Sequence, residues 1–180
     1  MTTTLSITES QTLAALRSFL LAALPAGVEV VKAQDNRVAE VEGANFVTMT
    51  PILREQLATN TAAYSDGYPS LPSVRTDLQQ EKVTIQLDIH GPASADNTQI
   101  IKSLFRTEWA TTQFSASGID VVPLYMGEPK QIPFLNAEQQ IEERWTVDAV
   151  LQANPITTVN QDFTQALTIG IKPIDQTFHP

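Results

Sequence analysis

The stretch KVTIQLDIHGP, residues 82–92, carries the clearest structural signal in this 180-residue sequence, and IEERWTVDAVLQANP, residues 141–155, repeats it. In the first stretch, aliphatic side chains alternate with polar ones at Val83, Ile85, Leu87 and Ile89. The second alternates in the same way at Trp145, Val147, Ala149 and Leu151. Successive side chains of a strand point to opposite faces of a sheet, so both stretches predict strands with one apolar and one polar face. The polar face carries short hydrogen-bonding groups, which indicates a surface for partners rather than a substrate pocket.

Two amphipathic helices are predicted. The first begins at a capping-box spacing, Ser6 and Glu9, and ends at Pro25 and Gly27. Its apolar stripe consists of Leu13, Leu16, Phe19, Leu20 and Leu24. The second helix is capped by Ser94 and runs to about residue 112. Its apolar face consists of Ile101, Leu104, Phe105 and Trp109. Trp109 and Trp145 are both expected to be buried in the core.

Further strands are predicted between these elements. Residues 28–34 form one, followed by a turn at Asp35 and Asn36, and residues 46–57 form a long one. The second half of 46–57 also has helical spacing, but a strand with Pro51 at an edge or a bulge is favoured. Residues 119–125 form an edge strand because they contain Pro123. A last strand is marked by Leu167, Ile169 and Ile171.

This order of elements predicts an α+β fold, a mostly antiparallel sheet with two helices packed on one face. Residues 1–180 are expected to form a single domain. Two long excursions are expected within this domain, at about 58–80 and at 126–139. The first could also form an irregular hairpin. The C-terminal tail, which contains His179, is expected to be flexible.

Composition excludes several classes of protein. A hydrophobic content of 42% is ordinary for a globular protein. The formal net charge of -9 argues against a protein that grips nucleic-acid phosphates. Without cysteine the chain has neither disulfides nor thiolate metal sites. The start lacks a basic region, and the apolar run 13–24 contains Arg17 and stops at Pro25, so neither a signal peptide nor a membrane span is expected.

One group of residues offers a possible chemistry. Asp88 and His90 lie two apart and share a strand face, and Asp148 could lie across from them. Such a group could bind a metal or perform acid–base catalysis, so a small metal-dependent hydrolase is one alternative. The favoured interpretation is that these are polar groups of the open sheet face. The sequence has neither a phosphate-binding glycine motif nor a Gly-x-Ser-x-Gly elbow. We therefore assign no catalytic, cofactor-binding or metal-binding residues from the sequence, and we do not expect an enzyme.

Most of the chain resembles the phage neck and tail-terminator proteins, the head-proximal tail completion components. The likeness rests on TIQLDIHGPASADNTQIIKSLFR and EPKQIPFLNAEQQIEERWTVDAVLQANP, with VEVVKAQDNRVAE and NFVTMTPILREQLATN nearer the start. It lies in overall pattern and brings no catalytic motif. It implies a tail-terminator-like α+β subunit that forms a homo-oligomeric ring of six copies at the head-proximal end of the tail tube.

The same resemblance implies the partners and the location. The ring would terminate the tube and dock to the neck or head connector, and would meet the sheath if the tail is contractile. DNA would pass through its lumen without specific binding, and an acidic lumen would avoid trapping phosphates. Such a protein is made in the host cytoplasm, resides in the virion tail or neck and has no membrane partner. A head-closure subunit or another connector associated with the tail tube is the structural alternative.

Overall fold

The computed structural model describes residues 3–33, 41, 43–67, 71–135, 141–164 and 169–170. Its main sheet has the strand order β2-β3-β6-β11-β7, and β8 also pairs with β11. These strands are β2 (Glu29–Lys32), β3 (Phe46–Gln56), β6 (Glu81–His90), β7 (Val121–Met126), β8 (Lys130–Gln131) and β11 (Arg144–Ala153). The β2–β3 pair is parallel and the other pairs are antiparallel. The predicted α+β class with a mostly antiparallel sheet is therefore confirmed.

The two alternating stretches of the sequence form the centre of this sheet. β6 and β11 pair along ten positions, from Arg144 opposite His90 to Ala153 opposite Glu81. Because directly paired residues share a face, the apolar residues of both strands lie on one side of the sheet. Register is fixed there, since a slip of one residue would turn that apolar set towards solvent.

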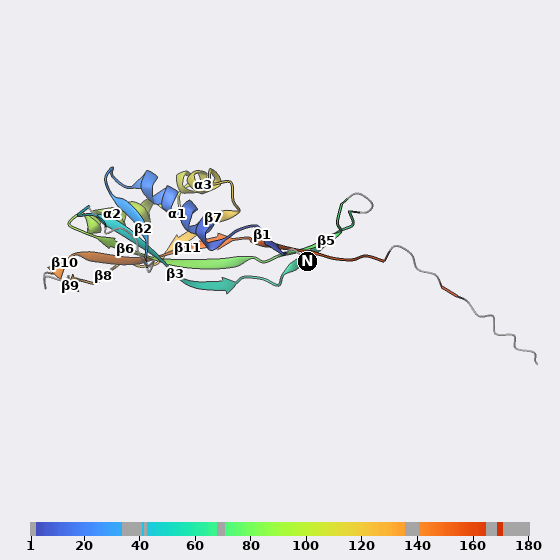
Figure 1. Ribbon diagram of the computed structural model, residues 1–180. Helices are drawn as coiled ribbons and strands as arrows, with labels where there is room; N and C mark the ends of the chain where they lie inside the picture. Colours follow the sequence, from blue (N-terminus) through green and yellow to red (C-terminus); the bar gives the residue numbers. More distant parts are fainter. Residues whose placement is uncertain are drawn as a thin grey trace, which may run out of the picture.

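In the described part of the chain, three helices rather than the predicted two cover the apolar face (Figure 1). They are α1 (Glu9–Ala23), α2 (Ser94–Leu104) and α3 (Glu108–Ser115). The predicted second helix is divided at residues 105–107, because Thr107 adopts an extended backbone and caps α3, its hydroxyl accepting from the amide of Ala110 at 3.3 Å. A helix that ends and restarts can turn its second half across β7.

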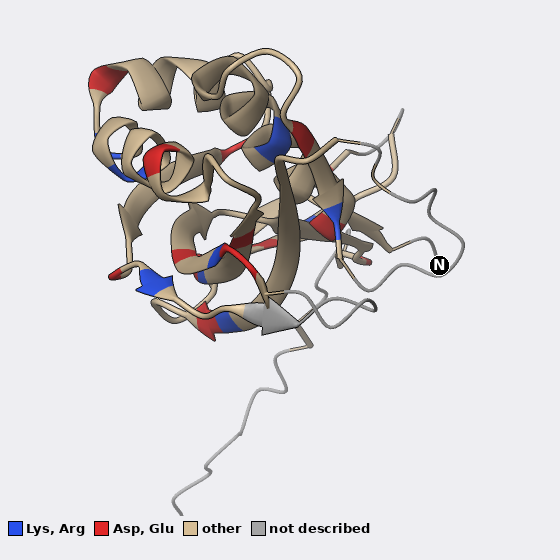
Figure 2. Cartoon of the chain, turned by 90° about the vertical axis from the view of Figure 1, so that its left-hand side faces the viewer, with Lys and Arg blue, Asp and Glu red and all other residues tan. Residues whose placement is uncertain are grey.

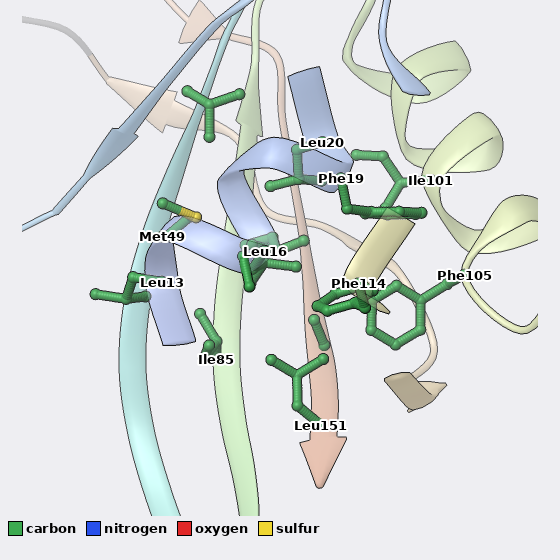
Figure 3. Packing of buried hydrophobic residues seen from close by; sticks show 14 of the residues in the cluster. Leu13, Leu16, Phe19, Leu20, Met49, Ile85, Ile101, Phe105, Phe114 and Leu151 are labelled. Carbon is green, nitrogen blue, oxygen red and sulfur yellow. The ribbon is translucent and has the colours of Figure 1, made fainter. Parts of the chain in front are cut away.

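Aromatic rings fill the space between the helices and the sheet (Figure 3). Phe19 is fully buried, with its ring centroid 5.5 Å from those of both Phe105 and Phe114 and 5.6 Å from that of Trp109. Aliphatic side chains from the sheet and helices complete the core, among them Leu16, Leu20, Met49, Ile85, Leu87, Ile101 and Leu151. The stripe predicted on α1 is therefore the side of that helix that faces the core.

The helix caps differ from those predicted. The capping box of α1 is Thr8 with Gln11 rather than Ser6 with Glu9: Thr8 Oγ1 accepts from the Gln11 amide at 3.3 Å, and Gln11 Oε1 accepts from the Thr8 amide at 2.8 Å. Ser6 instead accepts from the amide of Ile156 at 2.8 Å. At α2 the cap position is Ala93, and Ser94 is the buried first residue of the helix.

The two prolines of the main sheet lie where the loss of a backbone N–H donor does not break the hydrogen-bonded ladder, at a register shift and in an edge strand. Pro51 adjoins a register shift in the β3–β6 ladder, as predicted for a bulge. It also lies beyond the part of β3 that pairs with β2, which ends at Met49. Pro123 is in β7, the edge strand at the end of the strand order.

A second sheet continues from the first, and we call it the arm. Its strand order is β1-β12-β5-β4, with β1 (Thr4–Leu5), β4 (Thr61–Ser65), β5 (Val74–Leu78) and β12 (Ile156–Asn160), all antiparallel. Figure 1 shows the arm projecting beyond the helical layer. Residues 58–80 therefore contain a hairpin, β4–β5, while β1 and β12 were not predicted. The amide of Leu57 donates to the carbonyl of Gln80 at 2.9 Å and that of Gln79 to Pro155 at 3.0 Å, which joins the two sheets.

Some predicted features differ or lie outside the described residues. Residues 126–139 contain β8 and β9 (Phe134–Leu135), and β9 pairs with β10 (Ile141–Glu142). The predicted last strand is not present at Ile169, which lies outside any strand. Its other members, Leu167 and Ile171, fall outside the described residues, as do Asp35, Asn36, His179 and residues 68–70 and 136–139.

The prediction that both tryptophans are buried is wrong for Trp109, which is 36% exposed. Its ring is tilted by 55° to that of Phe19, and it is the exposed member of this aromatic cluster. Trp145 is half-buried, because it lies near the start of β11, opposite Gln131 of the two-residue strand β8. Phe19, Phe105 and Phe114 occupy the centre instead.

Candidate assembly surface

The polar face of the main sheet points away from the helices (Figure 1). We call this surface the open face. Asp88 is at its centre, accepting a hydrogen bond from Thr146 Oγ1 at 2.5 Å and another from Gln86 Nε2 at 2.9 Å. Arg144 Nε lies 3.9 Å from the same carboxylate. Its neighbours bury Asp88, and a satisfied carboxylate of this kind stabilises the pairing of β6 with β11.

His90 lies at the end of the same row of side chains. Its ring stacks on Phe46 of the neighbouring strand, with centroids 4.4 Å apart and planes 7° from parallel. Burial lowers the pKa of His90 below its ordinary 6.5 and Arg144 lowers it further, whereas Asp88 and Glu142 oppose this shift. A stacked neutral imidazole of this kind is a packing group of the sheet.

The three residues predicted as a possible catalytic group do not form one. Asp88 lies opposite Thr146 and Asp148 lies opposite Gln86, so the two carboxylates are offset along the strands. Within the described ranges, no cluster of three or more His, Asp or Glu side chains could hold a metal ion. Both oxygens of Asp88 accept hydrogen bonds from neutral side chains, which leaves them poorly placed to act as a base.

A less polar row crosses the open face beyond these groups. Leu53 of β3 lies opposite Thr84, Thr84 lies opposite Val150, and Val150 lies opposite Tyr125. Val150 is buried between its neighbours, whereas Leu53 is 51% exposed and Tyr125 42% exposed. Large exposed side chains therefore lie at both ends of this row, where a partner protein would find apolar surface to cover.

The arm has no hydrophobic layer of its own. One face carries Leu5, Ala62, Tyr64, Arg75, Asp77, Thr157 and Val159, and the other carries Thr4, Thr61, Ala63, Ser65, Val74, Thr76, Leu78, Ile156, Thr158 and Asn160. We call the second set the neutral face, because none of its residues is charged. All five residues of β4 are exposed and all five of β5 are only half-buried. A sheet ordinarily needs one face packed against a core, and the described residues do not provide such a layer over either face of the arm.

Aromatic and charged side chains meet on the other face of the arm. The rings of Tyr64 and Phe163 are 6.3 Å apart in an edge-on arrangement, and the Arg75 guanidinium lies 5.7 Å from the Tyr64 ring. Arg75 also pairs with Asp77 at 2.7 Å, and the hydrogen bond that Arg75 donates to this carboxylate raises the pKa of Arg75 above its ordinary value. These contacts align β4 with β5 without burying either of them.

Acidic and basic side chains are mixed over the surface of the molecule. Figure 2 shows acidic and basic positions interspersed along the strands rather than gathered into one basic surface. Several positive side chains are already paired with carboxylates, including Arg54 with Glu81 and Lys82 with Glu55. In the part of the chain that the structure describes, none of the helices is long and apolar enough to cross a membrane.

Sequence reasoning identified the polarity of the open face but missed two features of the surface, the exposure of Tyr125 on that face and the arm. Tyr125 was assigned to a short apolar run, and only the pairing of Val150 with Tyr125 places it on the open face. The arm was missed as a sheet because β12 has neither an apolar run nor a strict alternation. The Pro155 that precedes β12 could have signalled that a new strand begins there.

Fold and surface together are those of a structural protein with exposed strands and a main sheet that helices cover on one face. A comparison with family models agrees: the model described as phage neck terminator protein matches residues 10–176. The chain therefore belongs to the phage neck terminator family, and it is a structural component of the virion tail rather than an enzyme.

Other comparisons give less. No curated protein matches the chain. Among solved structures, it is similar to a chain from the cryo-EM structure of an extracellular contractile injection system, described as the PVC sheath/tube terminator in its extended state. That alignment has a TM-score of 0.41 and 12% identity, and it covers 96% of this chain. This chain spans 65% of the length of the solved one.

Proposed function

We propose that this protein forms a closed ring at the head-proximal end of a phage tail, where it stops growth of the tail tube and provides the surface to which the neck or head connector docks. The observation that carries the proposal is the arm, a four-stranded sheet without a hydrophobic layer in a member of the neck terminator family. Neighbouring subunits would supply the missing support.

Energetics favours this role over that of a solitary protein. Ordering each backbone residue costs about 1–2 kcal/mol, and burial of apolar surface normally offsets that cost. The strands of the arm bury little, yet they continue from strands of the main sheet. A subunit that uses the arm for contact would bury it on assembly and recover this cost there.

The acidic balance of the chain suits a passage for DNA. A net charge of -9 repels phosphates, so DNA would move through the lumen without specific binding. The remaining partners follow from the position in the tail: the tail tube protein below, the neck connector above and, in a contractile tail, the sheath around it. Synthesis would take place in the host cytoplasm before assembly.

Complementation in infected cells tests the proposal. Without this protein, lysates should contain filled heads that lack tails together with tails of abnormal length, while DNA packaging continues. Electron microscopy of lysates and of the neck of complemented particles would measure both. Normal virions without the protein, or a neck in which its copies do not form a closed ring, would contradict the proposal.

Two matched variants locate the contact surface. Leu53→Lys adds a charge to the open face, and Leu21→Lys adds the same charge to an exposed position of α1, where Leu21 is 42% exposed. Leu53→Lys should fold and fail to rescue tail completion, whereas Leu21→Lys should rescue it. Equal rescue by both variants would remove the open face from the assembly surface.

The neutral variant Asp88→Asn, His90→Gln and Asp148→Asn separates structure from chemistry. It keeps the size and much of the hydrogen bonding of each side chain, so virions should form. If this variant folds and yet blocks tail completion, the conclusion that these three residues take part in no chemical step is wrong.

A further inference from the structure

The outer edge of the arm lacks the protection usual for an exposed strand. β4 has the sequence TAAYS, without lysine, proline or any charge, and it pairs with β5 in unbroken register. An exposed edge strand presents unpaired backbone donors and acceptors, and natural proteins commonly protect it with charges, prolines or bulges. Ala62 and Ala63 are also small enough to let another backbone approach. The unprotected edge indicates that another strand covers it.

The opposite edge of the arm is β1, which has only two paired residues, Thr4 and Leu5. It covers Thr157 and Thr158 of the five-residue strand β12. Among the described strands, each copy of the chain therefore presents one free edge on each side of the same sheet. Two different edges on one subunit allow head-to-tail contacts, and such contacts close into a ring when the rotation is suitable.

Strand direction agrees with pairing between copies. Along the arm, β1, β12, β5 and β4 alternate in direction, so β1 runs antiparallel to β4. Rotation about a ring axis parallel to the strands preserves these directions. β4 of one copy would therefore meet β1 of the next in antiparallel orientation, which continues the pattern within each arm.

We propose that β4 pairs through its backbone with β1 of a neighbouring copy, so that the arms form one continuous sheet around the ring. This inference rests on the proposed ring and specifies the contact that closes it. In such a ring the neutral faces of all copies would lie on the same side of the continuous sheet, because paired residues share a face and rotation does not exchange the two faces.

Disulfide crosslinking tests this contact, because the chain has no native cysteine. Thr4 and Ala63 share the neutral face, whereas Leu5 and Ala62 share the other. Within one chain, β1 and β4 are three strand spacings apart, about 14 Å, which is too far for a disulfide. Any disulfide formed by such a pair therefore joins two copies.

Phage particles carrying Thr4→Cys with Ala63→Cys, or Leu5→Cys with Ala62→Cys, would be oxidised and separated by non-reducing electrophoresis. We expect at least one pair to give a ladder from dimer to the complete ring. The mixed pair Thr4→Cys with Ala62→Cys places the thiols on opposite faces and should give at least tenfold less crosslinking. No ladder from either same-face pair in particles with a closed ring would overturn this inference and leave the proposed ring standing. A crosslink from residue 63 to another virion protein would also overturn it.

If the cysteine variants fail to assemble, lysine substitution tests whether another strand covers β4. Ala63→Lys places the charge that natural edges use for protection on β4, and Thr111→Lys places it on exposed α3. With both proteins folded by circular dichroism, Ala63→Lys should reduce virion yield at least tenfold relative to Thr111→Lys. Equal yields would show that β4 remains uncovered. Particles in which the copies form no closed ring would instead refute the proposed function.

Discussion

Phe19 should be the most sensitive single position in the core. Its ring is fully buried and contacts three other aromatic rings, those of Phe105, Trp109 and Phe114. Truncation of a buried Phe to Ala costs about 3–5 kcal/mol, from lost transfer free energy and from the cavity left behind. Two of these rings lie on α3 and the third lies at the C-terminal end of α2, so they can close that cavity only if the helices move. We therefore expect Phe19→Ala near the upper end of the range.

Urea denaturation monitored by tryptophan fluorescence measures this effect. The chain has two tryptophans, and Trp109 lies 5.6 Å from Phe19, so its emission reports on the same cluster. With a urea dependence of about 3 kcal/mol per molar, typical of the upper end for small proteins, the unfolding midpoint should fall by about 1–1.7 M.

The control is Phe163→Ala, the same substitution at a ring that contacts the arm through Tyr64. Phe163 is partly exposed and touches Tyr64 edge-on, so its removal should cost less than about 1 kcal/mol. An equal midpoint shift for the two variants would refute the placement of the core between helices and sheet. A Phe19→Ala midpoint within about 0.3 M of wild type would refute it too.

Three further predictions concern the sheet and its connections. Gly91 has φ of +97°, and a Cβ there would lie 2.0 Å from the Ala44 carbonyl oxygen, so Gly91→Ala should lower the free energy of unfolding by at least about 3 kcal/mol. Gly118 has φ of +71° with open space around it, so Gly118→Ala should cost about 1 kcal/mol in the same urea titration. Thr8→Ala removes the capping box of α1 and should cost about 1 kcal/mol, measured by thermal unfolding; no change would contradict the cap. Burial lowers the pKa of His90 in the folded state, so the unfolded chain binds more protons just below pH 6.5. The stability that neutral His90 contributes is therefore complete above pH 6.5, and it is lost as the pH falls from there through the lowered pKa of the folded state. His90→Asn should flatten this part of the stability–pH curve, and an unchanged slope would exclude His90 as its source.

How much of the fold could be predicted depended on whether burial leaves a pattern in the sequence. β6 and β11 have one buried and one polar side, so their alternation revealed them and even the side that faces the helices. Thr107 has no such pattern: it lies within a helical run and divides it, because its hydroxyl caps α3. β12 was hidden for the opposite reason, since exposure on both faces of the arm removes the contrast between apolar and polar positions.

The open face was predictable as a surface but not as an arrangement. Period two places Asp88, His90 and Asp148 on one side, and that part of the prediction required only the sequence. Whether they form a group depends on the register between strands, which places Asp148 opposite Gln86 and Thr146 opposite Asp88. Register is set by burial along the whole β6–β11 ladder, and no local motif in the sequence reveals it.

The junction between the two sheets determines how the arm can act in assembly. β3 leads into β4, β5 leads into β6, and β11 leads into β12, with two hydrogen bonds across the junction at Leu57–Gln80 and Gln79–Pro155. A slip of the arm by one residue would have to propagate into the main sheet, where it would expose the apolar face. The core therefore holds the arm in a defined register before any partner arrives. A prearranged edge loses less conformational entropy on binding than a disordered one. In this way the core would contribute to the affinity of the proposed contact between arms without touching the neighbouring copy.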